Sequence, residues 1–274
     1  MTHAAFRLAL LAAFTAVPAA AVAQTKAMAP HRAVYELKLS QSRASVVSVR
    51  GRILYDFSGS ACDGYDLTFR QVSELNNGEG NVTLSDLRST TWEDGAGKSY
   101  KFQSQNFVNQ RMVDDVAGRA ERATSGITVT LTKPANVQNS LDATVNFPTE
   151  HMARIIAAAR EGKSLVELPV YDGSEKGEKV YSTLTVIGKE IAPDQRVPTD
   201  AAAGQADLAG MKRWPVTISY FDKSKSGGEQ LPVYALSFEM YENGISRALL
   251  LDYNDFSISG EMTSLEIKQP KPCP

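Results

Sequence analysis

Apolar and polar residues alternate along the first third of the chain. Between positions 47 and 57 the odd-numbered residues are apolar or glycine, whereas the even-numbered residues include Arg50 and Asp56. One apolar and one polar face are typical of a strand in an antiparallel sheet that is exposed on one side. The segments 35–39 and 65–69 repeat this alternation. Turn residues separate the three segments, so the pattern predicts consecutive antiparallel strands.

The last third of the chain shows the same pattern. A strand over 234–240 is followed by Asn243-Gly244, and Asn-Gly between apolar runs is the strongest short-range signal of a β-hairpin. The partner strand, 245–253, contains the continuous apolar stretch 248–251, which predicts burial on both faces. A further strand is expected over 256–267.

One segment has helical periodicity. Residues 149–161 follow Pro148, which favours the first turn of a helix, and precede Gly162, which favours its end. The large apolar side chains recur at helical spacing: Met152, Ile155, Ile156 and Ala159. We therefore expect a mainly β fold, a single curved antiparallel sheet forming a spiral or open barrel, with one internal helix near 149–161. The helix either plugs the concave side or forms a mobile lid.

Aromatic residues are frequent in the expected strands: Tyr65, Phe69, Trp92, Phe102, Phe107, Tyr234, Phe238 and Tyr241. They either form the core under the helix or line a cavity that receives an acyl chain. If a cavity exists, we expect these residues to line it: Met152, Ile155, Ile156, Tyr234 and Phe238. A ligand would then displace the helix or occupy a gap beside it.

The N-terminus has the features of an export signal. Arg7 precedes an apolar stretch over 8–17 that is too short to span a bilayer, and a small-residue site over 21–23 precedes Gln24. We expect a signal peptide over 1–23, and a single domain over 24–274 with no membrane span after signal removal. The full chain has a formal net charge of −2, which gives no reason to expect nucleic acid as a partner. We expect a periplasmic monomer.

The sequence contains two cysteines, Cys62 and Cys273. A redox role is disfavoured because they form no C-x-x-C pair. Zinc binding with His31 and His151 is disfavoured because their spacing matches no zinc pattern. In an exported protein such a pair usually forms one disulfide, which here would tie the start of the domain to its end.

A search for catalytic motifs finds no nucleophile elbow, zinc-protease motif or phosphate-binding loop. Glu150-His151 is the best acid–base candidate, but both residues suit the surface of a first helical turn. The acidic pairs at 114–115 and 172–175 lack the spacing of a calcium loop and suit solvated turns. We therefore expect neither catalytic residues nor a metal site, a cofactor or an enzymatic activity.

Four segments resemble the EipB family of alphaproteobacterial periplasmic proteins: HRAVYELKLS from His31, SGSACDGYDLTFR around Cys62, VYDGSEKGEKVY from Val170, and the terminal KPCP. The resemblance covers the chain from about residue 30 to its end. It implies a spiral β sheet with an internal helix, closed by a disulfide between Cys62 and Cys273. It also implies a role in cell-envelope integrity under stress, and a functional link to a periplasmic tetratricopeptide-repeat protein.

Two functions follow as hypotheses. The first is a non-enzymatic protein that maintains the cell envelope through protein–protein contacts, which the resemblance and the absence of catalytic motifs favour. The alternative is a periplasmic carrier that holds the acyl chains of a lipid or lipoprotein in the concavity of the sheet.

Overall fold

A computed structural model describes residues 28–78, 80–222, 231–269 and 273. The predicted signal peptide, 1–23, lies outside these residues. The described part contains one α-helix, α1 (Pro148–Arg160), and none of its helices is long and apolar enough to cross a membrane. Its strands are β1 (His31–Ser42), β2 (Ser48–Ser60), β3 (Gly64–Asn76), β4 (Val82–Glu93), β5 (Ser99–Val108), β6 (Arg111–Ala123), β7 (Gly126–Lys133), β8 (Val137–Leu141), β9 (Leu165–Val170), β10 (Tyr181–Ile187), β11 (Arg213–Asp222), β12 (Tyr234–Tyr241), β13 (Ser246–Asp252) and β14 (Phe256–Ile267).

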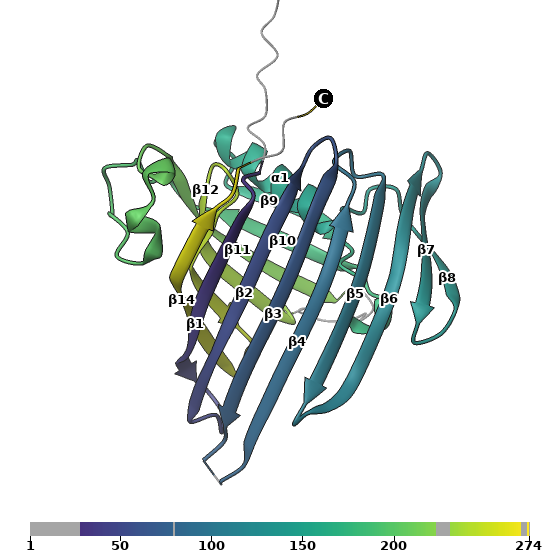
Figure 1. The fold of residues 1–274 in the computed structure, drawn as a ribbon, viewed down its shortest axis with the longest axis horizontal. Helices are drawn as coiled ribbons and strands as arrows, with labels where there is room; N and C mark the ends of the chain where they lie inside the picture. Colours follow the sequence, from purple (N-terminus) through teal and green to yellow (C-terminus); the bar gives the residue numbers. More distant parts are fainter. Residues whose placement is uncertain (1–27, 79, 223–230, 270–272, 274) are drawn as a thin grey trace, which may run out of the picture.

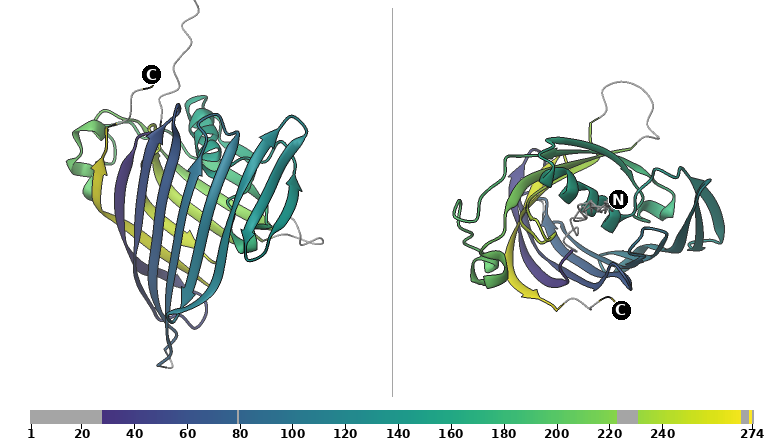
Figure 2. Two further views of the ribbon diagram at one scale, coloured as in Figure 1. Left: turned by 45° about the vertical axis from the view of Figure 1, so that its right-hand side comes forward. Right: turned by 90° about the horizontal axis from the view of Figure 1, so that it is seen from above.

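All these strands belong to one antiparallel sheet in which the first and last strands are neighbours. The order is β8-β7-β6-β5-β4-β3-β2-β1-β14-β13-β12-β11-β10-β9, and His31 of β1 lies opposite Ile267 of β14. The sheet edges, β8 and β9, are consecutive in the chain, and α1 connects them. The sheet curls around α1 without closing (Figures 1 and 2). The expected open spiral with an internal helix is confirmed.

Strand β2 shows why the alternation produces this sheet. Val49, Ile53 and Phe57 face the concave side and are buried, while Arg50 and Arg52 are exposed. Because side chains alternate between the faces of a strand, one apolar set contributes to the core without burying any charge.

The apolar stretch 248–251 differs from its prediction. Ala248 is exposed and the three leucines after it are only half-buried. Ala248 has a positive φ of 53°, and the pairing of β13 with β12 changes register between Ser237 and Glu239. A bulge therefore interrupts β13, and the convex side of this strand meets solvent rather than a second layer.

Helix α1 fills part of the concave side (Figure 2). Pro148 lies in its first turn, where a missing N–H costs nothing. Gly162, with a φ of 74°, ends the helix, and the N–H of Lys163 donates to the carbonyl of Ala158 at 3.0 Å. Within the helix Ile155 is fully buried. The apolar face predicted from periodicity is thus the face packed against the sheet.

The loop that follows β8 lies beside the opposite edge strand, β9, near the start of α1. Asn146 forms an isolated parallel bridge with Val170, and the N–H of Tyr171 donates to the carbonyl of Asn146 at 2.9 Å. The Asp172–Gly177 turn then packs onto β5–β7. A side chain at Gly173 would come within 2.4 Å of the Phe102 ring. This turn holds the spiral in its curled form.

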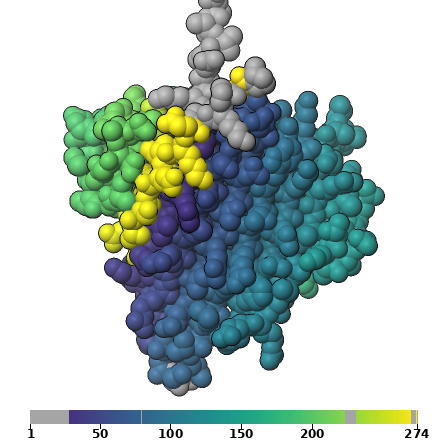
Figure 3. Space-filling view, in the orientation of Figure 1, coloured from purple at the N-terminus to yellow at the C-terminus, as the bar shows by residue number. Residues whose placement is uncertain are grey.

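The segment 193–212 lies on the convex side next to β14 (Figure 3). Two short 3₁₀ helices lie within it: η2 (Ala201–Gly204) and η3 (Ala206–Leu208). Asp200 pairs with Arg247 at 2.8 Å, and Glu239 pairs with Arg213 at 2.7 Å and Arg247 at 2.5 Å. Because Arg213 is fully buried, this ionic cluster fixes the segment against β11–β13.

Candidate functional site

The concave side of the sheet contains a cavity of about 250 Å³, which we call the inner cavity. Strands β1–β3 and β11–β13 supply most of its wall, and α1 supplies one side. Its aromatic lining consists of Tyr35, Tyr55, Phe69, Tyr220 and Phe238. Its other large apolar residues are Met28, Ile53, Met152, Ile218, Leu236, Leu249 and Leu251. Four more residues complete the wall: His31, Gln71, Gly244 and Ser246.

Of the helix residues proposed from the sequence, Met152 lines the inner cavity. Ile155 and Ile156 do not, because they are buried in the core together with Trp214. The cavity is therefore a gap beside the first turns of α1, rather than a space along its whole apolar face.

Of the two proposed strand residues, Phe238 lines the cavity and Tyr234 does not. Tyr234 instead stacks on Tyr220, with ring centroids 4.4 Å apart. Tyr220, which lines the cavity, is the cross-strand partner of Tyr234, so the Tyr234 ring packs beside the wall on the same face of the sheet.

The polar groups in the wall of the inner cavity are uncharged near neutral pH. Burial raises the pKa of Tyr55 to about 12 and raises the pKa of Tyr35 further, and the Tyr35 hydroxyl donates to the carbonyl of Ser246 at 2.6 Å. Burial also lowers the pKa of His31, whose Nδ1 lies 2.8 Å from the carbonyl of Ala29. The inner cavity thus suits an apolar ligand.

A second cavity, which we call the mouth cleft, has a volume of about 320 Å³ and lies between α1 and the loop 94–97. Glu93 lies at its base and is only 2% exposed. The Glu93 carboxylate accepts hydrogen bonds from the backbone N–H groups of Thr149 and Glu150, each at 2.7 Å. Burial raises the pKa of Glu93 to about 7, and the two helix N–H groups partly oppose this shift.

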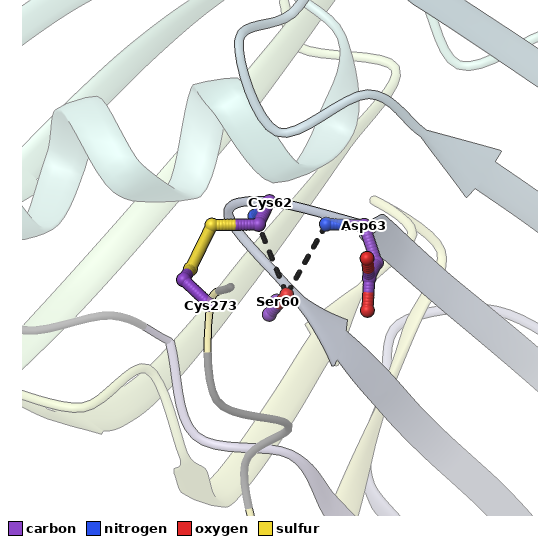
Figure 4. The surroundings of a disulfide bond; sticks show 4 residues. All are labelled: Ser60, Cys62, Asp63 and Cys273. Carbon is purple, nitrogen blue, oxygen red and sulfur yellow. Dashed lines mark hydrogen bonds between the residues drawn. A yellow bond between two sulfur atoms is a disulfide. The ribbon is translucent and has the colours of Figure 1, made fainter.

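A disulfide joins Cys62, which follows β2, to Cys273 near the end of the chain (Figure 4). The two residues are separated by 211 positions, and their Cα atoms are 5.6 Å apart. The Ser60 hydroxyl accepts hydrogen bonds from the N–H groups of Cys62 at 3.3 Å and Asp63 at 3.2 Å. The Trp92 indole donates to the carbonyl of Asp63 at 3.3 Å. These contacts hold the cysteine loop beside the mouth cleft.

The acid–base candidate Glu150-His151 is not a pair in space. The prediction that His151 lies on the surface is wrong: it is 3% exposed, and its Nε2 lies 3.0 Å from the hydroxyl of Thr183. Burial lowers the pKa of His151 to about 4. Glu150 instead forms ion pairs with Arg122 at 2.7 Å and Arg154 at 2.8 Å. Both residues therefore hold α1 in place.

The acidic segments also have structural contacts. Asp115 pairs with Lys133 at 2.8 Å, and Asp172 accepts a hydrogen bond from the N–H of Ser174 at 2.9 Å. Asp172 is half-buried rather than fully solvated, and burial raises its pKa. Within the described residues no group of three or more histidine, cysteine or acidic side chains could hold a metal ion.

Three cavity tyrosines lie outside the residues proposed from the sequence: Tyr35, Tyr55 and Tyr220. The alternation of side chains between the two faces of a strand, which we call strand parity, could have identified the first two, since they occupy the apolar face of predicted strands. Parity also explains why Trp92 and Phe107 do not reach the cavity: they lie beneath Lys101 and Arg88 on the convex face.

Comparison with known proteins gives a consistent result. The EipB-like family model matches residues 22–269. The chain is 36% identical over 252 residues to the cell envelope integrity protein EipB of Brucella abortus (strain 2308), a match that covers 91% of this chain and 88% of that protein. It also resembles the crystal structure of a β-barrel-like protein of a domain of unknown function from Brucella abortus. That match has a TM-score of 0.82 and 35% identity, and covers 89% of this chain and 99% of the solved one.

The matched region includes both cavities, helix α1 and every strand of the sheet, but not Cys273. By fold and by sequence, this chain belongs to the EipB-like family.

Proposed function

We propose that this chain helps to maintain the cell envelope as a non-enzymatic periplasmic protein that holds an acyl chain in its inner cavity. The relative named a cell envelope integrity protein supports the envelope role. The predicted signal peptide and the disulfide support the periplasm, because disulfides persist in oxidising compartments.

The observation that carries the proposal is the lining of the inner cavity. Its wall combines two methionines, three leucines and five aromatic residues, and its titratable groups are neutral near pH 7. Flexible methionine side chains adapt to chain-like apolar ligands. Removing apolar surface from water stabilises such a complex by roughly 25 cal/mol per Å².

Protein contacts, which the sequence alone favours, are a second candidate function. A hollow of about 720 Å³ on the convex face supports it. Trp92, Lys101 and Arg119 line this hollow, and tryptophan and arginine are enriched at protein interfaces. The tetratricopeptide-repeat partner stays a prediction.

The test is uptake of the fluorescent apolar probe N-phenylnaphthylamine by the exported, oxidised protein, together with native mass spectrometry of protein purified from periplasm. We expect saturable fluorescence and a co-purified lipid mass. Met152→Trp should fill the cavity and abolish uptake, whereas the matched control Met112→Trp, at an exposed position, should leave uptake unchanged. If the wild-type protein neither takes up the probe nor carries a lipid, the acyl-binding function is wrong.

A further inference from the structure

The inner cavity and the mouth cleft meet at one residue. Among the described residues, Met28 is the only one that lines both spaces. It is 8% exposed and packs against the hairpin turn at Gly244, where an added methyl group would lie 3.1 Å from Met28 Cε. Methionine has three rotatable side-chain bonds, so a rotamer change of Met28 would alter the wall between the two spaces without moving the backbone.

The two spaces differ in chemistry. The inner cavity has no charged group near pH 7, whereas the mouth cleft is lined by the acidic residues Glu93, Asp94 and Glu150. Among the described residues that line the cleft, Arg160 is the only basic one, and its guanidinium donates to the carbonyl of Glu242.

Glu93 is the key titratable group of the cleft: burial raises its pKa to about 7, and a cation beside it favours its ionised form. It is almost completely buried, and its partners are the backbone N–H groups of Thr149 and Glu150 together with the Thr149 side chain, all in the first turn of α1. No ion pair joins Glu93 to a basic side chain of the described residues. A buried carboxylate without a basic partner favours a cation that enters the cleft. The reason is that opposite charges attract each other more strongly in a low-dielectric interior than in water.

From this arrangement we propose that the ligand is a single-chain amphiphile with an amine head group, and that Met28 gates its entry. The chain occupies the inner cavity and the head lies in the mouth cleft beside Glu93. The inference rests on the proposed acyl-binding function. The inner cavity is smaller than the roughly 300–1,000 Å³ of most ligand pockets, which argues for one chain rather than two.

The head-group test uses competition for bound N-phenylnaphthylamine by dodecylamine, dodecanol and dodecanoate, which share chain length and differ in charge. We expect dodecylamine to compete at least about tenfold more strongly than dodecanoate, with dodecanol between them. Ala153→Lys places a cation in the cleft without touching Glu93, and should reverse the order of the amine and the carboxylate. The matched control Ala203→Lys, at an exposed position on the convex segment, should preserve it.

The gate test measures probe association by stopped-flow fluorescence. Met28→Ala should speed association several-fold and Met28→Trp should slow it, while the exposed control Met112→Ala should match the wild type. If the probe binds but the three head groups compete equally and Met28 variants keep the wild-type rate, the amphiphile inference is wrong and acyl binding stands. If no probe binds at all, both fail.

Discussion

The carboxylate of Glu93, at the end of β4, accepts a hydrogen bond from the backbone N–H of Thr149, 56 residues further along the chain, at 2.7 Å. No side chain of the helix's own entry segment caps α1, since Phe147 occupies the N-cap position. Glu93 therefore supplies from the sheet what a serine or aspartate would ordinarily supply from the helix. This contact joins the internal helix to the wall of the spiral.

The Glu93 contact predicts a distinctive pH dependence. Burial raises the pKa of Glu93 from an ordinary value of 4.5 to about 7, so the folded protein binds this proton more tightly than the unfolded chain. Glu93 therefore makes its full contribution to the free energy of unfolding below pH 4.5, and this contribution is lost as the pH rises through 7. Its size is on the order of 3 kcal/mol.

The measurement is urea unfolding of the wild type and Glu93→Gln between pH 5 and 8. His151, whose pKa burial lowers to about 4, gives an opposite trend below pH 6.5, but it is present in both proteins and cancels in the difference. We expect the wild type to lose stability relative to Glu93→Gln as the pH rises. A constant difference across this range would contradict the assignment.

The Asp172–Gly177 turn predicts a sensitive glycine. Gly173 has a φ of 71°, and a Cβ there would meet the Phe102 ring at 2.4 Å. Gly173→Ala should lower the free energy of unfolding by about 2–4 kcal/mol, because backbone strain adds to overpacking. Gly204→Ala is the control, since no atom lies within 4 Å of a Cβ at that position. Equal denaturation midpoints for the two variants would argue against this role of the turn.

The strands of the curled sheet could be predicted from sequence because the signals for them, side-chain alternation and turn residues, lie within short segments of the chain. Alternation within β2 assigns Val49 and Phe57 to one face, and the Asn243-Gly244 turn pairs β12 with β13. The pairing of β1 with β14 is not local, and strand alternation carries no signal of it; the expected disulfide indicates only that the start of the domain lies near its end. Bulges such as that at Ala248 leave little local signal, so the exposure of this residue does not follow from the sequence pattern.

The site was harder to predict than the fold. Helical periodicity places Met152 and Ile156 on one face, but which residue borders a gap depends on the sheet opposite, far away in sequence. The role of Glu93 also depends on a contact across 56 positions, and a single acidic residue at a strand end carries no signal of it. On its face of β4 the preceding positions are Ser89 and Thr91, so the sequence gives no sign that this carboxylate is buried.

The disulfide predicts a large loss of stability when either cysteine is replaced. The loop it closes spans 211 residues, for which loop-closure entropy gives an upper value of roughly 5 kcal/mol. Cys62→Ser and Cys273→Ser should each lower the denaturation midpoint, and the double variant should lower it no further. The wild type should also run faster on a non-reducing gel than on a reducing one. Free thiols in protein purified from periplasm would contradict the bond.

The ionic cluster under the segment 193–212 predicts another large effect. Arg213 is 1% exposed and depends on Glu239 for its charge balance. Glu239→Ala would remove the carboxylate that pairs with the buried guanidinium of Arg213, would leave Arg247 paired with Asp200, and should cost about 3–5 kcal/mol. The control Glu161→Ala removes an exposed pair with Lys163 and should cost less than about 1 kcal/mol. Similar unfolding free energies for the two variants would show that the cluster does not stabilise the fold.

The last prediction separates two positions on the apolar face of α1. Ile156 is 4% exposed and packs in the core, with the mouth cleft rather than the inner cavity beside it. Ile156→Trp should therefore overpack the core, costing about 1–3 kcal/mol, and leave the apolar probe bound. Met152→Trp, one turn earlier, should block the probe with a smaller loss of stability, because the new ring enters existing space. Probe fluorescence and urea unfolding of both variants give the comparison. If Ile156→Trp blocked uptake in a stably folded protein while Met152→Trp did not, the ligand would bind in the mouth cleft, and the inner cavity would be part of the core.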